Sequence, residues 1–228
     1  MSRIPKWWNR PRRITVFIDN DEWMLPWCEE LVDRINSGGD HAVLCRAVSD
    51  LAKGAVAFLL SCHRIVPPGS LTLHHRNLVV HASELPQGRG MSPLTWQILE
   101  GKNRIPVSLL EAAEEVDAGR VIYRDHLRFE GHELIDEMRH VLAEKTLQLC
   151  ERFLQEPVPP EGTPQEGEPS YWPRRGPADS VLDPQSSIAD QFNLLRVVDN
   201  DRYPAFFDWR GHRYRLRIEK AGKPDTQE

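Results

Sequence analysis

A histidine and an aspartate are the residues of this chain whose types and setting best suit acid–base chemistry. His81 ends the apolar run Leu78–Val80, and the turn-forming stretch Ser83–Gly90 follows it at once. Asp117 lies 36 positions further on (117 minus 81), in an Asp-Ala-Gly turn. An imidazole exchanges protons near neutral pH, and a neighbouring carboxylate can orient the ring and stabilise its charged form. We therefore take His81 and Asp117 as the candidate catalytic pair; a structurally satisfied histidine is the alternative.

The loop that follows His81 holds further polar candidates. Its proline and glycines predict a flexible turn whose backbone N–H groups are free to meet a carbonyl or phosphate oxygen. The predicted substrate contacts in this loop are Ser83, Gln87, Gly88, Arg89 and Gly90. Asn20 is a further predicted contact, because ligands collect at the carboxyl edge of parallel strands. Trp23, with Trp27 four positions on, offers an aromatic face to a sugar or base, or belongs to an apolar helix face.

Short apolar runs predict the strands that must position these residues. Continuous hydrophobic stretches indicate buried strands, and they occur at Ile14–Ile18, Ala42–Cys45, Ala55–Leu60 and Asn77–His81. Helices are expected between them, at about Met24–Ile35 and from Pro93 to Leu99. The alternation predicts an α/β fold with a Rossmann-like, doubly wound, mostly parallel sheet.

The following segments extend this frame into a catalytic domain over residues 1–155. Pro106–Leu110 and Arg120–Phe129 predict two strands of mixed polarity. An amphipathic helix is expected from about Glu133 to Phe153, with its apolar stripe on the sheet.

The rest of the chain divides into two further segments. Residues 156–176 are rich in Pro, Glu and Gly, which predicts an exposed linker or surface loop. Residues 177–228 predict a small C-terminal extension, with a helix near Ser187–Val198 and two strands, Ala205–Trp209 and Arg213–Ile218. This extension is too small to fold alone, so we expect it to dock on the main domain.

The composition limits the kinds of partner. The chain has 228 residues, 40% hydrophobic content and a formal net charge of -5, which disfavours nucleic acid as a partner. No apolar run approaches the length needed to span a bilayer, so no membrane partner is expected. The four cysteines show no paired or zinc-binding spacing, which indicates reduced thiols in a cytoplasmic protein. No metal site is expected, and a thiol mechanism through Cys62 and His63 lacks an orienting partner.

Several motifs in this chain resemble those of formyltetrahydrofolate-dependent formyltransferases. NLVVHASELPQGRGMSPLTWQILEG, residues 77–101, is similar to that family's pattern N-x-H-x-S-x-L-P-x-x-x-G followed by P-x-x-W. LLEAAEEVDAGRVI, residues 109–122, resembles the family's second signature with its catalytic Asp. In the tail, YWPRR, LDPQSSIADQFNLLRVVD and RYPAFF resemble the C-terminal segment of bacterial sugar N-formyltransferases. The resemblance extends from about Ile14 to Ile218.

The resemblance implies transfer of a formyl group from the co-substrate N10-formyltetrahydrofolate to a primary amine, without a metal. His81 would take up the amine proton or polarise the formyl oxygen, and Asp117 would hold the ring. The residues implied for folate binding are Arg64, Ile65, Val66, Ala113, Glu115 and Val116. The residues implied for substrate binding in the tail are Asn193, Arg196 and Tyr203, with docking contacts as the alternative.

One position departs from the family pattern. The family usually carries an Asn two residues before the histidine, where its amide donates a hydrogen bond to the formyl oxygen. Val79 occupies that position and has no donor. Asn77 lies on the same strand face but about 13 Å from His81 by strand rise. His81 or backbone N–H groups are expected to bind the oxyanion instead, and a non-catalytic folate- or nucleotide-sugar-binding protein is an alternative.

The choice of amine follows from the branches of the family. Length, tail and the acidic charge fit sugar N-formyltransferases better than methionyl-tRNA formyltransferases, which remain an alternative, or glycinamide ribonucleotide transformylases. The amino-acid sequences of these motifs most resemble those of enzymes of pseudaminic-acid-type pathways. The implied acceptor is a UDP-linked 4-amino-4,6-dideoxy sugar in cell-surface glycan (lipopolysaccharide) synthesis. A homodimer is left open as the assembly.

Overall fold

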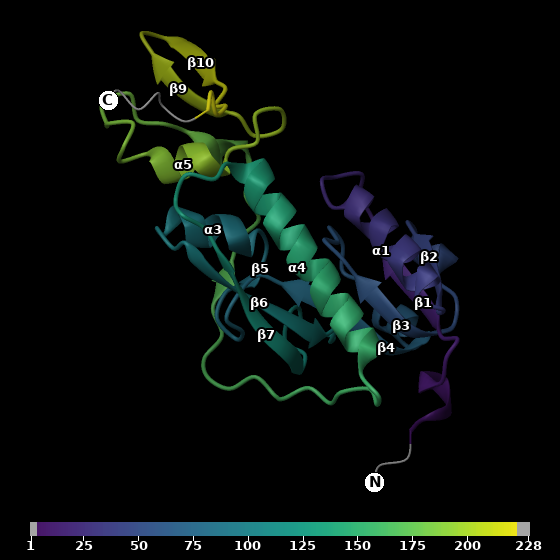
Figure 1. The fold of residues 1–228 in the computed structure, drawn as a ribbon. Coiled ribbons are helices and arrows are strands. Elements are labelled where there is room, and N and C mark those ends of the chain that lie inside the picture. Colours follow the sequence, from purple (N-terminus) through teal and green to yellow (C-terminus); the bar gives the residue numbers. More distant parts are fainter. Residues whose placement is uncertain (1–3, 223–228) are drawn as a thin grey trace, which may run out of the picture.

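Six strands form the central sheet of the computed structural model, which describes residues 4–222 (Figure 1). The strand order is β2-β1-β3-β4-β6-β7. The first four strands run parallel: β1 Arg13–Phe17, β2 His41–Cys45, β3 Gly54–Leu59 and β4 His74–His81. The other two, β6 Arg104–Glu111 and β7 Val121–Arg128, are antiparallel to their neighbours. The predicted mostly parallel α/β sheet is confirmed, and the two strands of mixed polarity form its antiparallel edge.

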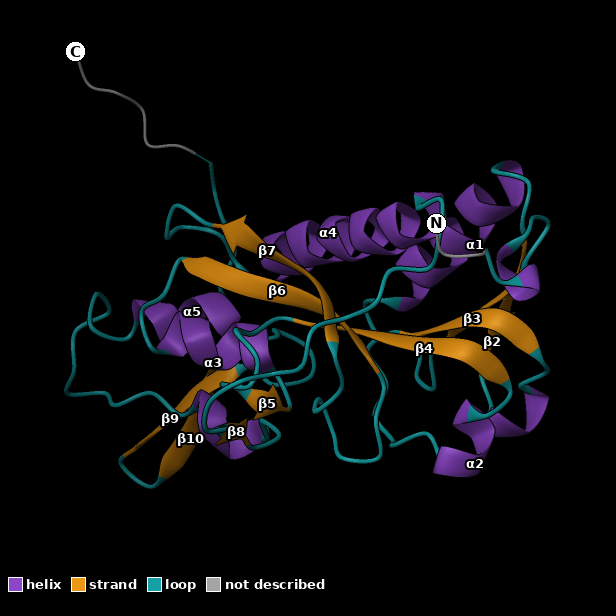
Figure 2. Ribbon diagram, turned by 90° about the horizontal axis from the view of Figure 1, so that it is seen from below, coloured by secondary structure: helices purple, strands orange, loops and turns teal. Residues whose placement is uncertain are grey.

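Helices lie on both faces of this sheet (Figure 2). Helix α1, Leu25–Ser37, and the long helix α4, Ile135–Gln155, cover one face. The one-turn helix α2, Pro68–Leu71, lies on the other. Helix α3 spans Pro93–Leu99, as predicted, and packs against α5, Phe192–Val197. The main hydrophobic core forms where the continuous apolar strands meet the apolar stripes of α1 and α4.

The C-terminal extension differs from its prediction in the length of its helix and in one added 3-10 turn. Helix α5 is shorter than the predicted Ser187–Val198, because the Gln191 side chain bonds the backbone of Asp183 and holds the preceding residues in turns. Strands β9, Ala205–Trp209, and β10, His212–Leu216, form the expected hairpin. The sequence did not predict the one-turn helix α2, three 3-10 turns and two short strands. The turns are η1 Lys6–Trp8, η2 Val48–Asp50 and η3 Pro177–Ser180, and the strands are β5 Arg89–Gly90 and β8 Tyr171–Trp172.

The segment predicted as an exposed linker is bound along the surface of the sheet domain. Thr163 and Val121 exchange backbone hydrogen bonds of 2.8 Å in both directions. The Arg120 side chain donates to the Gly162 carbonyl at 2.7 Å, and β8 pairs in parallel with β5. Composition indicated that this segment is polar and lies at the surface, but its partners come from distant parts of the chain. We call residues 162–173 the strap.

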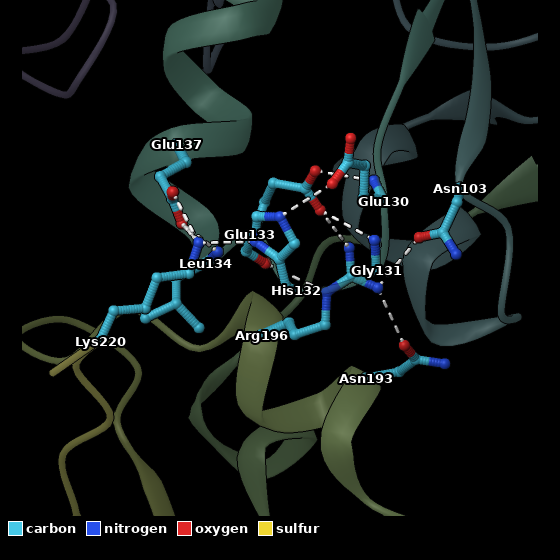
Figure 3. Close-up of polar contacts among 10 residues, drawn as sticks. All are labelled: Asn103, Glu130, Gly131, His132, Glu133, Leu134, Glu137, Asn193, Arg196 and Lys220. Atoms are coloured by element: carbon cyan, nitrogen blue, oxygen red, sulfur yellow. Dashed lines mark hydrogen bonds and ion pairs between the residues drawn. The ribbon is translucent and has the colours of Figure 1, made fainter. Parts of the chain in front are cut away.

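A buried arginine docks the C-terminal extension on the main domain (Figure 3). Arg196 on α5 is 1% exposed, and its guanidinium donates to the carbonyl and carboxylate of Glu133, before α4. It also donates to Asn103 at 3.0 Å and to Asn193 at 3.2 Å. Nearby, Lys220 pairs with Glu137 on α4. Arg196 and Asn193 are thus docking residues in this structure, and the geometry does not support the predicted substrate contact for either side chain.

No helix among residues 4–222 is long and apolar enough to cross a membrane.

Replacing Arg196 by Met tests the docking role of this side chain. The change leaves the half-buried Glu133 carboxylate without its cation, so we expect the free energy of unfolding to fall by about 3 kcal/mol. Urea unfolding followed by circular dichroism measures the loss. The matched control is Arg213→Met, which removes an exposed ion pair with Asp208 and should leave the unfolding midpoint nearly unchanged. Equal midpoints for the two variants would contradict the docking role.

Candidate active site

His81 and Asp117 meet at the carboxyl end of β4. The His81 residue is 6% exposed, and its Nδ1 lies 3.5 Å from Asp117 Oδ2. On the other side of the ring, Nε2 lies 2.7 Å from the Gly88 carbonyl oxygen. The structure therefore brings the two residues of the candidate pair together, and it adds a backbone contact that the sequence did not predict.

These contacts constrain the protons on the His81 ring. A carbonyl oxygen only accepts, so Nε2 carries a proton and donates it to Gly88. Nδ1 then faces a carboxylate, and a proton on Nδ1 turns that contact into an attraction between opposite charges. The arrangement suits a positively charged imidazole that can stabilise negative charge developing on a substrate.

The turn that carries Asp117 closes tightly against β6. Asp117 has a left-handed backbone with φ of 55°, which only a locally stabilised turn gives to a non-glycine residue. Gly119 lies so close to β6 that a Cβ there would come within 1.8 Å of the Glu111 carbonyl oxygen. Asp117 Oδ2 accepts the Gly90 N–H at 2.9 Å. One carboxylate oxygen thus contacts both the histidine and the loop after it.

The backbone N–H groups of the loop after His81 are occupied, which corrects the prediction that they are free. Those of residues 87–91 donate, in order, to Glu84 O, Ser170 Oγ, Ser170 O, Asp117 Oδ2 and Trp172 O. Most of these acceptors belong to the strap, whose pairing with the loop could not be read from composition. The loop therefore presents no free N–H in this stretch to an oxyanion or a phosphate.

Trp172 of the strap packs directly on the loop glycines. A Cβ on Gly88 would lie 2.1 Å from the Trp172 ring, and one on Gly90 would lie 2.5 Å from the Trp172 carbonyl oxygen. Both glycines also have positive φ, of 71° and 99°. They are required for this close approach. The isolated Tyr-Trp pair in a polar segment was the one sequence signal for the contact.

A second set of strap contacts joins two residues predicted for different ligands. Arg89, predicted to contact substrate, is 7% exposed and bonds Glu115, predicted to contact folate, at 2.7 Å. Its guanidinium also donates to Gln165 at 2.8 Å and to Tyr171 at 3.2 Å. Gln165 in turn donates to the carbonyls of Asp117 and Gly119 at 2.6 and 2.8 Å. Arg89 thus supports the Asp117 turn through Gln165.

The other predicted loop contacts have different settings. Gln87 is exposed and donates to the Glu168 carbonyl at 3.1 Å. Ser83 is 1% exposed, and its hydroxyl oxygen is buried without a hydrogen-bond partner among residues 4–222. Ser83 is therefore the polar group near His81 whose bonding capacity is unused.

Hydrogen bonds of Asp19 and Asn20 join the ends of β1 and β3. Asp19 accepts the N–H groups of His63 and Arg64 at 2.8 and 2.9 Å, and Asn20 donates to the Ser61 carbonyl at 2.8 Å. Burial raises the pKa of the Asp19 carboxyl, but the hydrogen bonds from His63, Asn20 and Arg64 outweigh it and keep that pKa below its usual range. The predicted contact Asn20 thus positions the exit of β3.

Glu22 joins this region to the C-terminal extension. Its carboxylate lies 3.1 Å from His63 Nε2 and 2.5 Å from Arg202. Trp23 lines a neighbouring hollow of about 700 Å³ between the loop after β1, the start of α4 and the tail. Seven carboxylates and four basic side chains line this hollow, so it does not suit a phosphate group. The adjacent Tyr203 lies in the tail turn, where its N–H donates to the Asp199 carbonyl.

The two segments predicted to bind folate, around residues 64–66 and 113–116, carry exposed apolar side chains and backbone donors. Ile65 is 68% exposed and Val116 is 39% exposed, whereas Val66 is buried in an apolar cluster. Val79 packs against the same cluster. Within the described chain, the backbone N–H groups of residues 65–66 and 113–116 have no protein acceptor. Exposed apolar side chains beside free backbone donors fit a pterin.

Two other chemistries find little support in the described residues. Burial raises the pKa of the Cys62 thiol to about 12, so its reactive thiolate form is suppressed at neutral pH. All four cysteines are free. Among residues 4–222, no group of three or more His, Cys, Asp and Glu side chains is arranged to hold a metal ion.

Comparison with known proteins gives a consistent result. A family model described as "Formyl transferase" matches residues 39–153. A methionyl-tRNA formyltransferase from Clostridium thermocellum has the same fold, with a TM-score of 0.77, 19% identity and coverage of 92% of this chain and 95% of that one. HypX from Aquifex aeolicus, solved with tetrahydrofolic acid, gives a TM-score of 0.72 at 19% identity over 94% of this chain, which spans 40% of HypX. A 4-N formyltransferase from Francisella tularensis gives 0.67 at 14% identity, covering 93% of this chain and all of that one.

Replacing Gln165 by Leu tests whether the strap holds the candidate catalytic turn. The change removes two hydrogen bonds to the Asp117 turn, so we expect amide hydrogen exchange at Gly90 and Ala118, whose N–H groups bond Asp117 and Glu115, to become about tenfold faster. Exchange measured by NMR reports each amide. The control is Gln148→Leu, an exposed position on α4, which should leave these amides unchanged. If exchange at Gly90 is the same in both variants, Gln165 does not position the turn.

Proposed function

The chain belongs to the formyl transferase family, and from this premise we propose that it formylates the amino group of a nucleotide-linked sugar. It is a transferase whose co-substrate is N10-formyltetrahydrofolate. The acceptor that we propose is a UDP-linked 4-amino-4,6-dideoxy sugar, formylated on its 4-amino group in glycan or pseudaminic-acid-type synthesis. The observation that carries the proposal is the contact of His81 with Asp117 at the carboxyl end of β4.

The reaction exchanges one bond and one proton. The amine nitrogen bonds to the formyl carbon, the bond from that carbon to N10 of the folate breaks, and a proton passes from the amine to N10. His81, with Asp117 beside Nδ1, supplies positive charge for the oxyanion of the tetrahedral intermediate. Asp117 orients the ring and can exchange a proton with it.

In this proposal the His81 ring supplies positive charge, and the Ser83 hydroxyl donates the hydrogen bond to the oxyanion. Val79 offers no hydrogen bond where the family usually has Asn, and the Asn77 amide is occupied with the Leu71 carbonyl at 2.7 Å. The N–H groups of residues 87–91 are taken by protein acceptors. The Ser83 hydroxyl, buried and without a partner among the described residues, is left to donate.

The folate is proposed to lie against the apolar cluster of Val66 and Val79. In this proposal Ile65 and residues 113–116 border that surface, and both segments carry backbone N–H groups without an acceptor among the described residues. When bound there, the co-substrate supplies the activated formyl carbon. The nearby Val79 side chain then contributes an apolar floor and not a hydrogen bond.

The sugar acceptor is supported by charge and by the structural neighbours. A net charge of -5 gives no field that attracts a polyanion such as tRNA. The 4-N formyltransferase from Francisella tularensis is matched over its whole length. The TM-score of 0.77 with a methionyl-tRNA formyltransferase favours a second candidate, transfer to the amino group of an aminoacylated tRNA. Val79 favours a third, a non-catalytic binding protein.

Mass spectrometry of the products distinguishes these candidates. The purified chain is incubated with N10-formyltetrahydrofolate and either a panel of UDP- and dTDP-linked 4-amino sugars or methionyl-tRNA. We expect one sugar to gain the mass of a formyl group and the tRNA to remain unmodified. Formylated tRNA would support the second candidate, and folate binding without any formylated amine would support the third.

Two histidine variants, one at the candidate site and one at the surface, test the role of His81 in the same assay. His81→Ala should lower the rate of formyl transfer at least about 100-fold, because the charged imidazole is lost from the oxyanion site. His140→Ala is the matched control, since His140 is an exposed residue of α4, with 58% of its side chain accessible. Comparable rates for the two variants, with unchanged melting temperatures, would refute the proposed mechanism.

A further inference from the structure

A hollow lined by basic side chains lies at the amino-terminal edge of the sheet. Its volume is about 500 Å³. Arg13 begins β1, Lys53 directly precedes β3, and His74 and His75 begin β4, so parallel strands bring them to one edge. Lys6 of η1 completes the set. We call this feature the basic hollow.

The charge of the basic hollow is opposite to that of the whole chain. None of its thirteen lining residues is Asp or Glu, although the chain carries a net charge of -5. Arg12 also lines it, but that guanidinium is buried and paired with Asp40 at 2.6 Å. Lys6, Arg13 and Lys53 have no carboxylate partner within residues 4–222. Three unpaired cations around one hollow create a local positive potential.

A buried histidine in the basic hollow has an unpaired nitrogen. His74 is 7% exposed, and its Nε2 lies 2.8 Å from the Thr15 hydroxyl oxygen. Its Nδ1 has no partner among the described residues. If Thr15 donates its single proton to Nε2, the ring proton sits on Nδ1, and this N–H is the one group left unpaired. If instead Nε2 carried the ring proton and donated it to Thr15, both the hydroxyl proton and the Nδ1 lone pair would be unpaired. The tautomer with the proton on Nδ1 is therefore favoured.

The surroundings keep the His74 ring neutral and in place. Burial, and then the charges of Arg13 and His75, lower the pKa of His74 to about 4. A Cβ on Gly54 would lie 2.8 Å from the His74 ring, so glycine provides the space that the ring fills. Beside it, the His75 ring stacks on Trp7 with centroids 4.7 Å apart. The basic hollow thus combines cations, a neutral N–H donor and an aromatic wall.

We propose that the basic hollow binds the diphosphate group of a small molecule. A diphosphate carries several negative charges in a compact form, which matches three unpaired cations better than a single carboxylate does. The volume exceeds what one phosphate needs and lies within the range of small-molecule sites. His74 and His81 are the two ends of β4, about 23 Å apart at 3.3 Å per residue. This site is therefore separate from the candidate active site and does not rest on the proposed function.

Titration calorimetry of the full chain with inorganic pyrophosphate tests the proposal. We expect saturable binding at one site, weakened by added salt. The double variant Arg13→Gln/Lys53→Gln should weaken binding at least about tenfold, since two of the three unpaired cations are lost. The control pair Lys102→Gln/Arg215→Gln removes the same charge from exposed positions elsewhere and should change the affinity less than about twofold. Equal melting temperatures establish that each variant is folded.

The NMR signals of the His74 ring provide an independent readout. If the His74 Nδ1–H donates to pyrophosphate, directly or after a small movement of the ring, its NMR resonance should shift during the titration. The pyrophosphate concentration at half of that shift should equal the one at half-saturation in calorimetry. Absence of saturable binding at about 10 mM pyrophosphate in low salt would overturn the proposal. Equal weakening by the control pair, or unmoved His74 signals at saturation, would overturn it as well, because both indicate non-specific attraction to surface charge.

Discussion

The hydrogen bond from the Gly90 N–H to the Asp117 carboxylate is the contact on which the candidate site depends. It joins the loop after β4 to the turn after β6, two segments that the sheet alone does not hold together. The same carboxylate oxygen faces His81 Nδ1, and the same loop accepts from His81 Nε2 through the Gly88 carbonyl. A displacement of either segment would therefore change both contacts of the ring.

The strap holds the loop after β4 and the Asp117 turn in a single conformation. Trp172 covers the loop glycines, Ser170 accepts the Gly88 N–H, and Gln165 bonds the carbonyls of the Asp117 turn. These contacts fix a left-handed aspartate and two positive-φ glycines, conformations that a free loop would leave readily. The strap also occupies the loop N–H groups. In the proposed mechanism, oxyanion binding therefore shifts to the His81 ring and the Ser83 hydroxyl.

The sequence predicted those features that depend on local patterns. Strands with continuous apolar residues, such as β3, and the helix from Pro93 to Leu99 were predicted closely, because burial on both faces and a proline at the helix start leave a local signal. His81 at a strand end and Asp117 in a turn followed from the same kind of signal. Predicting that the two side chains meet, at 3.5 Å in the structure, also required the resemblance of the motifs to a known family.

Features that depend on distant partners were not predictable in the same way. The strap has a polar composition typical of a linker, and nothing local reveals that Thr163 pairs with Val121 or that Trp172 covers Gly88. For Arg196 the sequence predicts either a substrate contact or a docking contact, and only the folded chain shows its burial against Glu133. The basic hollow combines residues 6, 13, 53 and 74, which only the parallel register brings to one edge.

Formyl transfer by Asp117→Asn under single-turnover conditions tests the central claim most directly. The amide keeps the shape of the side chain and an oxygen that can accept the Gly90 N–H, but it removes the negative charge beside His81. We expect the melting temperature and the slow exchange of the Gly90 amide to be preserved while the rate of transfer falls at least about 100-fold. A rate within about twofold of the unmodified chain would contradict the claim that the carboxylate charge sustains the chemistry of His81.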